Sequence, residues 1–77
     1  MLKTFAKTLD LKGLVRPVPL ELTCRELALL RAGDLLEVVT TDRRAIEDFS
    51  AWSVTSGHDL LESSQLGHMF RFVIRKR

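Results

Sequence analysis

The middle of the chain reads LLEVVTT over residues 35–41. This stretch is rich in aliphatic and β-branched side chains, which favour strands, and it is too short to form a stable helix by itself. We therefore expect a largely buried central strand here, and the elements on either side follow from it.

On the N-terminal side, the sequence predicts an amphipathic helix that begins near Pro17 and Pro19. Proline is tolerated in the first turn of a helix, where its missing N–H has no intrahelical partner. Gly33 is expected to end the helix in a left-handed conformation. Apolar residues at three- and four-residue steps predict the core-facing stripe, which consists of Leu20, Thr23, Cys24, Leu27 and Leu30.

On the C-terminal side, a second amphipathic helix is predicted. Asp42 is expected to be its N-cap, because an aspartate oxygen can accept hydrogen bonds from the free amides of the first turn. Gly57 is expected to end the helix. The predicted apolar stripe consists of Ala45, Ile46, Phe49 and Trp52.

Strands are predicted at both ends of the chain. Residues 8–12 alternate between polar and apolar, and Gly13 ends this strand. Residues 58–64 form a short strand, residues 65–67 a turn and residues 68–76 a last strand. Alternation in the last strand predicts a core face and a solvent face, made respectively of Phe70, Phe72 and Ile74 and of Arg71, Val73 and Arg75.

The predicted order of elements is β-α-β-α-β-β. Because a strand, helix, strand connection is nearly always right-handed, both helices should cover one face of a four-stranded mixed sheet. The fold class is α/β (α+β), a two-layer sandwich. A chain of 77 residues has room for one domain, which we place at residues 1–77.

Composition restricts the class of protein. With 45% hydrophobic residues and a net charge of +2, the chain is globular. No segment approaches the roughly 20 apolar residues of a membrane span. Residues 1–7 lack the apolar run of a secretory signal, so we expect a cytoplasmic protein without a membrane partner.

The few sulfur and imidazole groups predict neither a disulfide nor a metal site. Cys24 is the single cysteine, and its place on the apolar stripe predicts a buried, inert packing residue. His58 and His68 have no Cys or His at ligand spacing. We expect no metal and no cofactor.

The last ten residues are basic and contain no acid. Their cations could attract RNA, an acidic protein face or phosphate groups. The alternative is that the charges protect an exposed edge strand from pairing with other chains. The cations are Arg71, Arg75, Lys76 and Arg77.

Several short motifs occur together in a defined order. They are GLVRPVP at residues 13–19, AGDLLEV at 32–38, TD at 41–42, DF at 48–49, AW at 51–52 and GHDL at 57–60. Over residues 9–76 their order and spacing resemble the TusA/SirA family of sulfur carriers. The resemblance implies the same two-layer β-α-β-α-β-β fold. It also implies persulfide relay between proteins on the cysteine of a Cys-Pro-x-Pro motif.

The resemblance places Arg16 at the position of that cysteine. Arginine has no sulfur nucleophile and keeps its positive charge, so the relay chemistry is unavailable at this residue. Three accounts of Arg16 stay open: a natural relative that lost sulfur transfer, a deliberate replacement of a native cysteine, and an anion-binding site.

The sequence therefore predicts a non-catalytic member of the family that docks onto another protein of a sulfur-transfer or redox pathway as a monomer. The docking surface would contain Arg16, Pro17 and Pro19. One alternative is an active sulfurtransferase, if Arg16 replaces a native cysteine. The other is an RNA- or anion-binding module that uses the basic last strand, although nucleic acid is not the partner we expect. Further candidate contacts for an anion or a partner are Lys12, Arg43 and Arg44.

Overall fold

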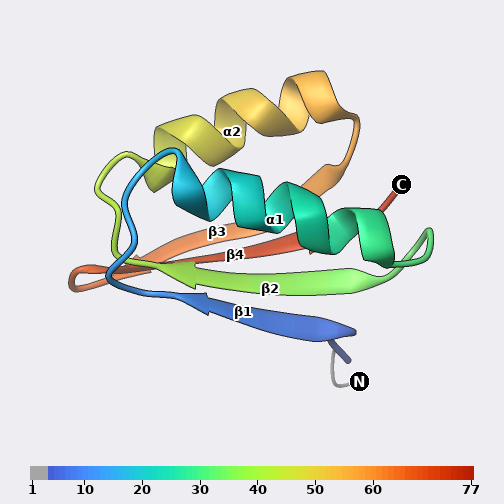
Figure 1. Ribbon diagram of the computed structural model, residues 1–77, viewed down its shortest axis with the longest axis horizontal. Helices are drawn as coiled ribbons and strands as arrows, with labels where there is room; N and C mark the ends of the chain where they lie inside the picture. Colours follow the sequence, from blue (N-terminus) through green and yellow to red (C-terminus); the bar gives the residue numbers. More distant parts are fainter. Residues whose placement is uncertain (1–3) are drawn as a thin grey trace.

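The computed structural model of the chain describes residues 4–77, and residues 1–3, part of the segment considered above for a secretory signal, lie outside them. Figure 1 shows a sheet with both helices on one of its faces, as predicted. The elements in chain order are β1 (Lys7–Leu11), α1 (Val18–Leu29), β2 (Leu35–Thr40), α2 (Ala45–Ser56), β3 (Asp59–Leu66) and β4 (Met69–Arg75). The predicted order and the two-layer α+β architecture are confirmed.

The sheet has the strand order β1-β2-β4-β3. β1 runs parallel to β2, while β4 is antiparallel to both β2 and β3, so the sheet is mixed. A parallel pair needs a crossover connection, which α1 supplies. β2 and β4 occupy the two central positions, which explains why Leu36 and Val38 of β2 are fully buried.

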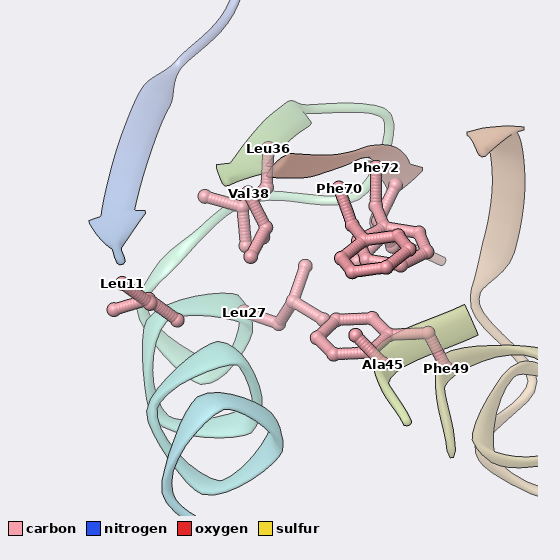
Figure 2. Packing of buried hydrophobic residues seen from close by; sticks show 9 residues of the cluster. Leu11, Leu27, Leu36, Val38, Ala45, Phe49, Phe70 and Phe72 are labelled. Atoms are coloured by element: carbon pink, nitrogen blue, oxygen red, sulfur yellow. The ribbon is translucent and has the colours of Figure 1, made fainter. Parts of the chain in front are cut away.

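The core lies between the sheet and the two helices (Figure 2). The ring of Phe49 from α2 stacks on the ring of Phe72 from β4, with 4.3 Å between centroids and 4° between planes. Leu27 of α1 is 1% exposed and contributes to the same cluster. Each helix thus contributes a fully buried side chain to the cluster over the central strands.

The structure corrects the predicted role of Gly33. α1 ends at Leu29, and its C-cap residue Leu30 is extended. Gly33 has a positive φ of 92°, but it lies in the following turn, where its N–H donates to the carbonyl of Lys76 at 2.7 Å. Gly57, in contrast, is the left-handed C-cap of α2, as predicted.

The prediction that Cys24 is buried was wrong, because its side chain is exposed. The fully buried row of α1 is Pro19, Thr23 and Leu27, spaced by four residues. Cys24 follows Thr23 by one residue and is therefore turned by about 100° around the helix axis. The core-facing side of α1 is thus turned relative to the predicted stripe, since Leu22, which precedes Thr23, packs against the core and Cys24 does not.

The prediction that Val73 lies on the solvent-exposed face of the last strand was also wrong. Val73 lies outside the core cluster, yet it is 0% exposed. Its cross-strand neighbours are Glu37 on β2 and Glu62 on β3, and Arg71 on β4 makes ion pairs with both carboxylates. Long charged side chains can cover an apolar neighbour with their stems, so this part of the outer sheet face is closed by charged residues.

Smaller differences concern the ends of elements. β1 begins and ends one residue earlier than predicted, and β3 extends to Leu66, so the turn before β4 lies at residues 67–68. Ile46, placed on the buried stripe of the second helix, is 36% exposed and lies at its edge.

Candidate functional site

The loop before α1 is held by the loop that follows β2. The N–H of Gly13 donates to Thr41 Oγ1 at 2.9 Å, and the N–H of Arg16 donates to Asp42 Oδ2 at 2.9 Å. Both loops leave the carboxyl ends of the parallel strands β1 and β2, which lie at the same end of the sheet. The conformation around Arg16 therefore depends on β2 and α2 as well as on the local sequence.

Asp42 does not have the N-cap position predicted for it. α2 begins at Ala45, and its N-cap residue, Arg44, makes no side-chain capping hydrogen bond. Asp42 Oδ1 instead accepts from the N–H of Arg44 at 3.1 Å, in the manner of an Asx turn, while Oδ2 accepts from Arg16. One carboxylate thus joins the approaches to both helices.

The side chain of Arg16 reaches across to α2. Its Nε lies 3.1 Å from Asp48 Oδ2, and the two side chains are 52% and 21% exposed. Asp48 lies in the first turn of α2, where the helix dipole also favours a carboxylate. Arg16 is therefore oriented by an ion pair at the surface and is still accessible to solvent.

A groove of about 420 Å³ separates α1 from α2 beside this ion pair. Trp52 is partly exposed on one wall, and its ring meets Phe49 of the core edge-on, with 6.1 Å between centroids. Pro17 and Leu20 also border a second, adjacent depression, whose lining includes Cys24. The groove walls comprise Arg16, Pro17, Leu20, Asp48, Ala51, Trp52 and Thr55.

The structure brings together some of the predicted site residues and separates others. Arg16 and Pro17 line the groove, whereas Pro19 is buried and can only shape the start of α1. Lys12 Nζ lies 3.3 Å from Asp10 Oδ2. The backbone N–H of Lys12 also donates to the Asp10 carboxylate, and this hydrogen bond lowers the pKa of Asp10.

The two remaining candidate cations, at the start of α2, do not line this groove. Arg43 lines a separate pocket of about 570 Å³ together with His68 and Glu47. Arg44 is exposed, and its polar contacts within residues 4–77 are made by its backbone, whose N–H donates to Asp42 and whose carbonyl accepts from the N–H of Asp48. The predicted cation set is therefore not one cluster.

Sequence reasoning did not single out Asp48 as a site residue and placed Trp52 in the core. Both are only partly buried and both line the groove. Asp48, Trp52 and Thr55 follow each other at steps of four and three residues, which places them on one side of α2. The spacing could have predicted that these three residues share one side of α2. It could not predict that Arg16 lies opposite that side.

The basic last strand is largely neutralised within the chain. Arg75 Nη2 and Arg77 Nε lie 2.8 and 3.0 Å from the carboxylate of Asp59, and hydrogen bonds from these two arginines lower the pKa of Asp59. Arg71 pairs with Glu37, and Lys76 Nζ donates to the carbonyl of Leu27. These contacts weigh against a free basic patch of the kind that binds RNA.

Residues 4–77 also contain neither a candidate metal site nor a candidate membrane-spanning helix. No group of three or more His, Cys, Asp or Glu side chains in this part of the chain could hold a metal ion. No helix in the same part is long and apolar enough to cross a membrane.

The fold and the site together define a class of small two-layer α+β proteins that present a short proline-containing loop before the first helix. Within this class, residues 7–76 match the family described as sulfurtransferase TusA, and the chain belongs to that family. The chain is 44% identical over 70 residues to the "Putative sulfur carrier protein YrkI" of Bacillus subtilis, covering 91% of this chain and 93% of that one. It is 35% identical over 72 residues to the "Sulfur carrier protein TusA" of Allochromatium vinosum, covering 94% and 95%. Membership in a sulfur-carrier family implies interaction with other proteins of sulfur transfer.

Proposed function

We propose that this chain is a TusA-family member that carries no sulfur itself and acts by docking onto another protein of a sulfur-transfer or redox pathway. The docking surface is the loop and groove around Arg16 and Pro17. The observation that carries the proposal is Arg16 at the start of α1, paired with Asp48, where the family resemblance places a cysteine.

The chemistry of sulfur relay explains why this position matters. A carrier thiol must be a good nucleophile, and free N–H groups at a helix N-terminus stabilise a thiolate. A guanidinium at the same place has no atom that can accept and release sulfur. The ion pair with Asp48 compensates the unfavourable placement of a cation at a positive helix end, which would otherwise cost about 0.3–1 kcal/mol.

Cys24 is the single thiol in the sequence, and its exposure makes it accessible to reagents. It is nevertheless poorly placed for relay. It lies six residues after Val18, the first residue of α1, which is about 9 Å along the helix axis, beyond the first turn, where the dipole effect fades. A relay through Cys24 would lack the activation that the loop position provides.

Mass spectrometry tests the loss of sulfur transfer. The unaltered chain, C24S and the double variant R16C/C24S are incubated with a cysteine desulfurase and cysteine, and their intact masses are measured. We expect no added sulfur on the first two and one added atom on R16C/C24S. Sulfur on Cys24 of the unaltered chain would exclude the proposal, and no sulfur on a folded R16C/C24S would exclude the assigned position.

The docking role is tested with the unaltered chain immobilised as bait for proteins from its own host. We expect R16E to lose the captured protein, because it reverses the charge at the centre of the surface. R43E is the matched control, since Arg43 is also exposed and lines the other pocket. Equal capture by all three baits would contradict docking through Arg16.

A further inference from the structure

We propose that the partner is a protein that places a carboxylate on Arg16 and an apolar side chain in the groove between α1 and α2. This inference rests on the docking function proposed above and adds the chemistry that the partner must have. A segment with aspartate or glutamate next to leucine, isoleucine or phenylalanine would meet both requirements.

The first argument is the unused hydrogen-bonding capacity of Arg16. Its recorded side-chain contact in residues 4–77 is the single one from Nε to Asp48 at 3.1 Å. The two terminal nitrogens are left with donor hydrogens on a side chain that is 52% exposed. A guanidinium can bind a carboxylate with two parallel hydrogen bonds, so Arg16 can hold Asp48 on one edge and a second carboxylate on another.

The second argument is the apolar character of the adjacent wall. Pro17, Leu20 and Trp52 line the groove next to Arg16. Val15, which precedes Arg16, is 68% exposed and has no place in the core cluster. An apolar side chain entering the groove would remove the surfaces of Pro17, Leu20 and Trp52 from water, which is the main favourable term in association.

The third argument concerns which anion fits. Asp42 and Asp48 both lie close to Arg16, one at its backbone N–H and one at its Nε. Two nearby carboxylates oppose a multiply charged phosphate more than they oppose a single carboxylate. A protein surface that binds nucleic acid also needs several free cations, whereas Arg71, Arg75 and Arg77 form ion pairs within the chain. The arrangement therefore favours an acidic and apolar protein segment.

The test uses two small probes that differ only in charge. N-acetyl-leucine has an apolar side chain and a carboxylate, and N-acetyl-leucinamide has the same side chain without the charge. Each is titrated into ¹⁵N-labelled protein, and shifts are followed at the Trp52 indole and at the backbone amides of Arg16 and Ala51. Probes of this size are expected to bind with Kd values of about 1–10 mM.

We expect the acid to bind about two- to fivefold more tightly than the amide, because an exposed charge pair contributes modestly. In R16Q this ratio should fall to about one, whereas in the matched control R43Q it should be unchanged. In D48N the ratio should rise, since a neighbouring negative charge that repels the carboxylate of the probe is removed.

Four results would overturn the inference: equal binding of the two probes to the unaltered chain, an unchanged ratio in R16Q, shifts confined to other surfaces, or no shifts. A dilution series without probe is run in parallel. Shifts of the same residues with protein concentration would mean that a second copy of the chain fills the groove, which also contradicts the inference. The sulfur assay involves no groove probe, so failure of this inference would leave the loss of sulfur transfer standing.

Discussion

Replacement of Phe49 by alanine tests how the groove wall is anchored to the core. Phe49 is 1% exposed, it stacks on Phe72 with 4.3 Å between centroids, and it meets Trp52 edge-on. Removing a buried phenylalanine costs about 3–5 kcal/mol, and an aromatic pair accounts for about 0.5–1.5 kcal/mol of such a loss. At about 0.05–0.15 kcal/mol per residue, a chain of 77 residues has a total stability of about 4–12 kcal/mol. We therefore expect F49A to lose at least a quarter of the free energy of unfolding.

The assay is urea unfolding followed by far-ultraviolet circular dichroism, with the fluorescence of the single tryptophan, Trp52, as a second probe. V54A is the matched control, because Val54 is on the same helix and is 83% exposed. Its free energy of unfolding should change by no more than about 0.5 kcal/mol. A loss below about 1 kcal/mol in F49A, or equal losses in the two variants, would refute the assignment of Phe49 as the anchor of α2.

Two further predictions concern the loop clamp and the C-terminal ion pairs. D42A should lower the free energy of unfolding by about 1 kcal/mol, because the N–H groups of Arg16 and Arg44 lose their acceptor. Urea unfolding measures the loss, and the chemical shifts of the two amide protons report the broken hydrogen bonds. Unchanged chemical shifts of both amide protons would contradict the prediction. In the folded chain the pKa of Asp59 is lowered by hydrogen bonds from Arg75 and Arg77, so the stability that these bonds add is present above the unfolded-state pKa of about 3.9 and is lost as the pH falls through the lowered folded-state pKa. The difference in stability between the unaltered chain and D59N should accordingly be constant near neutral pH and shrink in acid, and a difference independent of pH would show that the ionised Asp59 adds nothing.

The errors in the predicted core have a common physical cause. The period of apolar residues predicts an inward-facing side for each element, but not which residues at the edges of that side are covered by neighbouring elements. On α1, Thr23 is buried and Leu22 packs against the core, whereas Cys24 on the other side of Thr23 is exposed. Val73 is buried on the opposite face of the sheet, where Arg71 joins the two glutamates of neighbouring strands. Packing against neighbouring elements decided both cases.

In the site, too, the sequence predicts some properties, and contacts between distant residues decide the others. The motif at residues 13–19 and the resemblance it carries predict an arginine at the start of the first helix. They therefore also predict that this position has no sulfur nucleophile. The partner of that arginine could not be predicted, because Asp48 is on the other helix. The clamp by Asp42 likewise joins two loops that meet at one end of the sheet.

The sequence by itself determined the order of strands and helices, the two-layer architecture and the chemical identity of residue 16. These properties depend on local conformational preference, on the spacing of apolar side chains and on the handedness of the crossover. The tertiary structure alone decided that Arg16 pairs with Asp48 and that a groove with Trp52 lies beside it. Such contacts join residues far apart in the chain, and their geometry depends on how the two helices pack on the sheet.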